Sequence, residues 1–172
     1  MQNLFSYPLD VDELGSALRR YKLKADSDEL AYIKEVLKVD DVKSFESQME
    51  VKLYKSEHRL EVKGTAKADI ELTSVISLEK FVKSYAPEFT VIFDTQMTPQ
   101  ELREIEFDFE DDVPDIIING KIDLAEIAME QIALVIDDFP RKEGEVFEFK
   151  SEFDEETTQA MNPFAALAKL KK

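Results

Sequence analysis

The carboxylates between Asp108 and Asp115 are the residues of this chain whose type and spacing best suit chemistry. Clustered carboxylates can hold Mg²⁺, and a metal-bound water can attack a phosphodiester. The residues that would hold the ion are Asp108, Glu110, Asp111 and Asp112. A calcium loop counted from Asp108 fails, because Val113 stands at the glycine position and Asn119 at the last glutamate position. We interpret the stretch as a solvated acidic loop and keep a metal-dependent RNA hydrolase as an alternative function.

Candidates for nucleophilic or acid–base catalysis are few. The chain has no cysteine, which excludes disulfides, thiolate zinc sites and cysteine nucleophiles. Its one histidine, His58, lies in a predicted turn between Lys55 and Arg59 and has no visible partner to orient it. With four glycines, the sequence carries no phosphate-binding loop and no dinucleotide fingerprint. We therefore predict a protein that is not an enzyme and that uses no metal and no cofactor.

The formal net charge of the 172 residues is −16. A field of this sign repels phosphate backbones, so we expect no DNA partner, and RNA only at a local basic patch or through another protein. A basic protein is the better electrostatic match. Cations gather at Arg19 to Lys24, at Arg141 with Lys142, and at the last four residues. The sequence shows no signal peptide and no membrane span, so we expect a cytoplasmic protein with no membrane partner.

The element expected to organise the fold is a helix from Leu124 to Ile136. Asp123 is suited to cap it, and Glu126 would complete a capping box. Apolar residues occupy most of its circumference, with Val135 on the same stripe as Leu124, so we predict a core helix. It should end before Pro140, since proline disfavours helical geometry in the preceding residue.

Two alternating stretches, Phe45 to Tyr54 and Leu60 to Leu72, predict a long antiparallel hairpin with one buried and one solvated face. On the buried face, Gly64, Ala66 and Ala68 are small. They leave room for the core helix to pack closely, or for a ligand between hairpin and helix. A small-ligand binding protein is therefore a second alternative function.

Shorter elements complete the predicted fold. Strands are expected within residues 3–14, 20–25, 89–93, 105–109 and 146–149. A capping box of Asp26 and Glu29 begins a helix that runs to about Lys38. Residues 73–81 are predicted as extended chain or a turn, and Thr98 starts a single helical turn. The fold class is α+β, with a curved, mainly antiparallel sheet, two main helices and a short tail helix. A partly closed barrel is an alternative form of that sheet.

The chain divides by pattern into a single domain, residues 1–153, and a polar spacer with an amphipathic tail, residues 154–172. In the tail, Asn162 suits a helix cap and Pro163 the first helical position, while apolar residues share one face. A helix of about ten residues is unstable alone, so it must dock on its own domain or on a partner. The predicted partner-binding residues are Arg141, Lys142, Asn162, Pro163, Phe164, Leu167, Lys169, Leu170, Lys171 and Lys172.

Three segments, ELTSVISLEKF, INGKIDLAEIAMEQIALVIDDFPRKEG and NPFAALAKLKK, occur in an order and spacing that resemble the YceD family. The resemblance extends from about Tyr7 to Lys172 and implies a cytoplasmic protein needed for synthesis, processing or stability of 23S ribosomal RNA. It implies no catalytic residue, and a ribosomal protein or precursor 23S rRNA as partner. Many relatives carry cysteine in the segment that matches Thr73 to Ser77, where this chain has Ser74, and paired cysteines near the C-terminus. A thiol or metal role in those relatives cannot operate here.

Overall fold

The computed structural model describes residues 4–98, 100–101 and 115–146. The chain divides into two compact units, Met1–Lys142 and Glu143–Lys172. All named elements belong to the first unit. In chain order these are β1 (Pro8–Asp10), β2 (Arg19–Lys24), α1 (Ser27–Leu37), β3 (Asp41–Tyr54), a 3₁₀ turn (Lys55–Glu57), β4 (Arg59–Thr73), β5 (Lys80–Tyr85), β6 (Glu88–Asp94), β7 (Asp115–Ile116), β8 (Lys121–Asp123) and α3 (Leu124–Ala133). The predicted boundary after residue 153, the tail and the strand at 105–109 lie outside the described residues.

The predicted hairpin is confirmed as β3 and β4. The two strands pair antiparallel from Asp41 with Glu71 to Tyr54 with Arg59. Alternate residues of both strands are buried, because a pleated strand sends successive side chains to opposite faces. His58 lies in the connecting turn, as predicted, and its φ is 51°.

The main sheet has the strand order β2-β3-β4-β6-β7, and β5 also pairs with β4. Residues 59–65 of β4 pair with β6, whereas residues 68–73 pair with β5. Between the two partners, the backbone N–H of Ala66 donates to the carbonyl of Pro87. Only the short β6–β7 contact is parallel, so the sheet is mostly antiparallel as predicted. The sheet is not closed, and the partly closed barrel is not confirmed.

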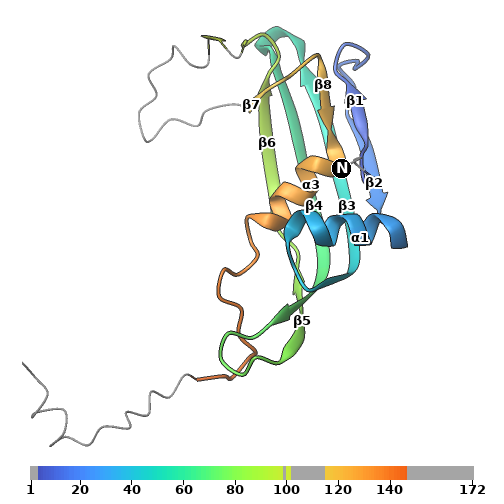
Figure 1. The fold of residues 1–172 in the computed structure, drawn as a ribbon. Coiled ribbons are helices and arrows are strands. Elements are labelled where there is room, and N and C mark those ends of the chain that lie inside the picture. Colours follow the sequence, from blue (N-terminus) through green and yellow to red (C-terminus); the bar gives the residue numbers. More distant parts are fainter. Residues whose placement is uncertain (1–3, 99, 102–114, 147–172) are drawn as a thin grey trace, which may run out of the picture. The chain divides into compact units, whose positions relative to one another are not determined.

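Both helices cover the same face of this sheet (Figure 1). Asp26 and Glu29 form the predicted capping box of α1, with donor–acceptor distances of 2.7–2.9 Å. The side chain of Asp123 caps α3, but its acceptor oxygens are shared with the hydroxyl of Ser6 and the N–H of Tyr7, and only its half of the predicted box is formed. Through these bonds the cap also fixes the chain next to β1, which pairs with β8.

The end of α3 differs from the prediction. The helix stops at Ala133 rather than Ile136, and Val135 is 40% exposed instead of buried. Leu134, which follows the last helical residue, is 77% exposed. Four residues after the end of the helix, Asp137 binds side chains of β5. Neither of the two described helices is long and apolar enough to cross a membrane.

Candidate functional site

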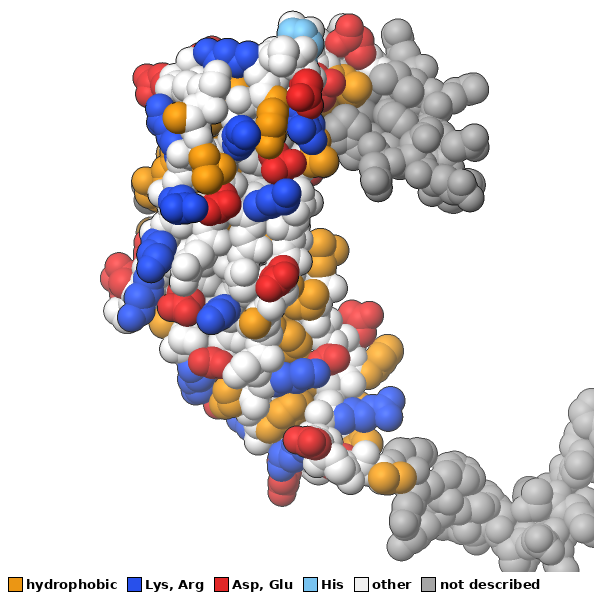
Figure 2. Space-filling model, turned by 180° about the vertical axis from the view of Figure 1, so that it is seen from behind, with side chains coloured by type: hydrophobic (Ala, Val, Ile, Leu, Met, Phe, Trp, Pro, Cys, Tyr) orange, Lys and Arg blue, Asp and Glu red, His pale blue; other side chains and the backbone are white. Residues whose placement is uncertain are grey.

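The face of the sheet opposite the helices is densely charged, and no other described element covers it (Figure 2). The strand register and the ion pairs place nine cations and eight carboxylates on it. The cations are Arg20, Lys22, Lys24, Lys43, Lys52, Arg59, Lys63, Lys67 and Lys80, and the carboxylates are Asp41, Glu46, Glu50, Glu61, Asp69, Glu71, Glu88 and Asp94. This outer face is thus nearly balanced in charge, and the excess negative charge of the chain lies elsewhere.

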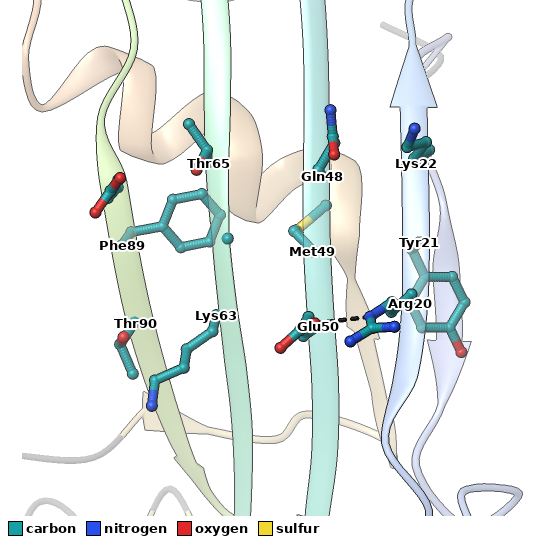
Figure 3. A pocket seen from close by; sticks show the side chains of 12 residues that line it. Arg20, Tyr21, Lys22, Gln48, Met49, Glu50, Lys63, Thr65, Phe89 and Thr90 are labelled. Atoms are coloured by element: carbon teal, nitrogen blue, oxygen red, sulfur yellow. Dashed lines mark hydrogen bonds and ion pairs between the residues drawn. The ribbon is translucent and has the colours of Figure 1, made fainter.

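A shallow hollow of about 590 Å³ lies in the middle of the outer face (Figure 3). The pairing register sets its side chains in rows across the strands, such as Arg20, Glu50, Lys63 and Thr90. The Nε of Arg20 is 2.7 Å from Oε1 of Glu50, across strands β2 and β3. Oppositely charged neighbours of this kind stabilise a sheet and suit a polar binding surface.

The charged side chains that line the hollow are open to solvent. Within the described ranges of the chain, no group of three or more histidine or carboxylate side chains could hold a metal ion. A surface with exposed side chains of both charges can bind a charged partner.

The buried face of the hairpin is closely packed around Gly64. A Cβ atom at Gly64 would lie 2.5 Å from the carbonyl oxygen of Gln48 and 2.7 Å from Cγ of Met49. Ala66 and Ala68 are almost completely buried. Gly64 thus lets β3 and its side chains approach closely, and the ligand cavity between hairpin and helix stays a prediction.

A second cluster forms where the segment after α3 meets the β4–β5 turn, at the lower end of the sheet in Figure 1. Oδ2 of Asp137 lies 2.5 Å from Nζ of Lys83 and 2.8 Å from the hydroxyl of Tyr85. The backbone N–H of Val75 donates to the carbonyl of Pro140 over 2.9 Å. Lys142 forms an ion pair with Glu79. These contacts bring together two of the segments that carry the family resemblance, residues 71–81 and 118–144.

The contacts of Asp137 shift two pKa values. Hydrogen bonds from Lys83, and then from Tyr85, hold the pKa of Asp137 below its ordinary value, because they favour the charged carboxylate. Burial, followed by the hydrogen bond to Asp137, raises the pKa of Tyr85 to about 12. Both groups therefore keep their neutral-pH charge states, and the cluster is a structural clamp on the turn.

Ser74 shapes the turn from inside. Its side chain is fully buried, and its Oγ accepts hydrogen bonds from the N–H groups of Ile76 and Ser77 at 3.1 and 3.3 Å. Its backbone N–H donates to the carbonyl of Glu79, and its carbonyl accepts from the N–H of Leu78. The hydroxyl of Ser74 therefore organises the backbone of the β4–β5 turn.

Of the predicted partner-binding residues, the structure describes Arg141 and Lys142. Arg141 is exposed, whereas Lys142 is held by Glu79. The tail residues Asn162 to Lys172 and the carboxylates from Asp108 to Asp112 lie outside the described residues, so those predictions remain predictions. Asp115 is exposed in β7. The sequence reading missed β5 and the clustering of the turn with the segment after α3.

Comparison with known proteins gives one family. The family model described as large ribosomal RNA subunit accumulation protein YceD matches residues 62–171. The match begins within β4 and includes β5, β6, α3 and the segment after it. No curated protein and no solved structure matches this chain.

Proposed function

Because the chain belongs to the YceD family of large ribosomal RNA subunit accumulation proteins, we propose that it supports 23S rRNA as a non-catalytic binding factor. The observation that carries the proposal is the open, charge-balanced outer face beside a packed helical face. A surface of this kind can bind another macromolecule, whereas α1 and α3 cover the opposite face of the sheet. The action would take place in the cytoplasm, where large ribosomal subunits are made.

A basic ribosomal protein fits the described surface better than precursor rRNA does. Cations of the outer face stand beside carboxylates, as Lys63 stands 3.3 Å from Glu61, and continuous positive charge for phosphates is lacking. Single-stranded RNA also needs aromatic rings for stacking. Among the described outward residues of the sheet, Tyr54 is the one aromatic. Lys52 and Arg59 already lie over its ring, at 4.6 and 4.3 Å from the centroid.

The predicted recognition element of this function is the tail with its lysines. Phe164, Leu167 and Leu170 would fill an apolar groove on the partner, and the exposed Arg141 would lie near the base of the tail in sequence. This part of the proposal is supported by the sequence pattern alone.

The test uses the purified full-length chain, immobilised and incubated with proteins extracted from purified large ribosomal subunits. A parallel sample receives a 23S rRNA transcript. We expect one or a few basic proteins to be retained at low salt and released near 1 M salt. The Debye length, over which charges act on one another, shortens from about 10 Å at 0.1 M to about 3 Å at 1 M. A chain that lacks residues 162–172 should retain less. Retention of the transcript but of no protein would contradict the protein partner.

The hydrolase alternative predicts a different result in the same samples. Magnesium-dependent cleavage of the transcript, abolished when Asp108, Glu110, Asp111 and Asp112 are replaced by alanine, would refute a non-catalytic role. In cells, loss of the protein should lower the ratio of 23S to 16S rRNA. The quadruple variant should restore that ratio if those carboxylates have no catalytic task.

A further inference from the structure

The β4–β5 turn exposes an apolar residue in a backbone conformation that such residues avoid. Leu78 has a φ of 59°, and its side chain is 77% exposed. A left-handed conformation is unfavourable for a bulky residue, and glycine or asparagine would fit it better. Four non-glycine residues in the described part of the chain have positive φ, and the other three are Lys38, His58 and Asn119. Leu78 is therefore the one apolar member of this group.

Leu78 thus departs from two preferences at once. Its backbone conformation favours glycine or asparagine, and its exposure to solvent favours a polar side chain. Departures of this kind concentrate at functional sites, where the surrounding structure holds the strained residue in place. Here the turn is held from several sides. The backbone carbonyl of Ser74 accepts a hydrogen bond from the N–H of Leu78 at 3.0 Å. Glu79, the next residue, forms an ion pair with Lys142. The leucine is thus presented on a preorganised turn, which lowers the entropy cost of binding.

Two further exposed apolar side chains belong to the same hydrogen-bonded unit. Val75 is 47% exposed, and Phe139, the residue before Pro140, is 72% exposed. The bond from the N–H of Val75 to the carbonyl of Pro140 links the two segments that carry them. We call Val75, Leu78 and Phe139 the apolar tip. Exposed apolar groups that lie close together mark interaction sites more often than isolated ones do.

We propose that the apolar tip is the docking element for the protein partner of this chain, with Leu78 inserted into an apolar pocket on a basic protein surface. This inference rests on the proposed function, because it names the surface that the ribosomal protein would contact. The partner would then be contacted by two elements. One is the tail, which was predicted from the sequence alone, and the other is the apolar tip on the folded domain. Buried apolar anchors of this kind carry most of the energy of a protein interface.

Charge argues for a protein rather than RNA at this tip. Three lysines of the turn and its neighbouring segments are engaged with carboxylates, since Lys142 binds Glu79, Lys83 binds Asp137 and Lys80 binds Glu71 at 2.9 Å. Arg141 is exposed, so the turn offers one cation rather than a continuous row. An aliphatic side chain has no ring on which a base could stack. The net charge of −16 steers basic proteins toward the chain and repels RNA.

The test compares Leu78→Asn and Leu78→Gly with Leu78→Met in the full-length chain. The probe is the total protein extracted from purified large subunits, with retained proteins identified by mass spectrometry and the dissociation constant then measured for the main one. We expect Leu78→Asn and Leu78→Gly to weaken this binding at least tenfold, and Leu78→Met to change it less than threefold. The thermal midpoint of the Asn and Gly variants should be unchanged or higher by about 2–4 °C, because both residues accept the left-handed conformation.

Leu18→Asn is the matched control. Leu18 is 46% exposed and precedes β2, which pairs with the end of β3 far from the β4–β5 turn. The Leu18→Asn variant should bind the retained ribosomal protein as tightly as the unaltered chain does. Equal binding by Leu78→Asn and Leu18→Asn would overturn the docking proposal and leave the proposed function standing. Retention of no protein by the unaltered chain would overturn both, and retention of a 23S rRNA transcript independent of Leu78 would replace the protein with RNA.

Discussion

Replacement of Gly64 by alanine should destabilise the protein, although alanine normally strengthens a strand. The added Cβ would lie 2.5 Å from the carbonyl oxygen of Gln48, 2.7 Å from Cγ of Met49 and 3.1 Å from Cζ of Phe89. The two side chains can move, but the carbonyl belongs to β3, which is paired with β4 along its whole length. Relief of the contact therefore requires a shift of the central strand pair.

The size of the effect follows from two opposed contributions. Overpacking of this kind costs about 1–3 kcal/mol. Removal of glycine from a strand interior returns about 0.5–1 kcal/mol. The two ranges combine to a loss of about 0–2.5 kcal/mol. Because the 2.5 Å contact is with backbone, the loss should be at least about 1 kcal/mol, which corresponds to a decrease in thermal midpoint of at least about 3 °C for a domain of this size. Valine at the same position should cost more, because its branched side chain meets the same strand.

The assay is urea unfolding followed by far-ultraviolet circular dichroism, with Gly15→Ala as the matched control. A Cβ at Gly15 would have no atom within 4 Å, and its φ lies outside the left-handed region. That variant should gain about 0.5 kcal/mol through the unfolded state. If Gly64→Ala is as stable as Gly15→Ala, with the same slope in urea, the close approach of β3 to β4 described above is refuted.

Four further variants test the elements that position the turn and the helices. Asp26→Ala should lower the free energy of unfolding by about 1 kcal/mol, since it removes the carboxylate that accepts from the N–H groups of Asp28 and Glu29 at the start of α1; urea unfolding against Asp28→Ala measures it. Asp137→Asn should cost about 1 kcal/mol at pH 7, and because the folded pKa of Asp137 is lowered, the difference from the unaltered chain should vanish as the pH falls through the acid range below about 4. Tyr85→Phe should remove a tyrosinate absorbance step near pH 12 in a rapid spectrophotometric titration, and a step lost instead near pH 10 would contradict the burial of that hydroxyl. Ser74→Ala should cost about 1–2 kcal/mol, because the N–H groups of Ile76 and Ser77 lose their acceptor; amide hydrogen exchange at those two residues should accelerate.

The hairpin and α1 could be predicted from the sequence because their signals are local. Alternation over Phe45 to Tyr54 reports the pleat itself, and the box of Asp26 and Glu29 involves residues three apart. The family resemblance, carried by segments quoted from the sequence, is confirmed by the match over residues 62–171.

The strand β5 escaped prediction because Lys83 occupies a position on the helix side of the sheet, between Phe81 and Tyr85. A lysine there interrupts the apolar alternation, and only the distant Asp137 explains it, across 54 residues of sequence. The end of α3 was also predicted too late, because apolar residues continue through Ile136 although the helix ends at Ala133. Long-range pairing of charges leaves no periodic signal.

The candidate site was predicted least well. Exposure of Leu78 depends on the turn that Ser74 builds, and no spacing of residues in SVISLEK indicates a positive φ at a leucine. The outer face was visible in the sequence as the polar side of the hairpin. Its near balance of charge appeared only when the register set β2 beside β3.

The way β4 changes partners along its length has a consequence for how the domain can open. The first half of β4 pairs with β6 and the second half pairs with β5. Between these two halves, the N–H of Ala66 donates to the carbonyl of Pro87. Separation of β5 alone would break its ladder with residues 68–73 of β4 and the bonds of Lys83 and Tyr85 to Asp137, whereas residues 59–65 would keep their ladder with β6.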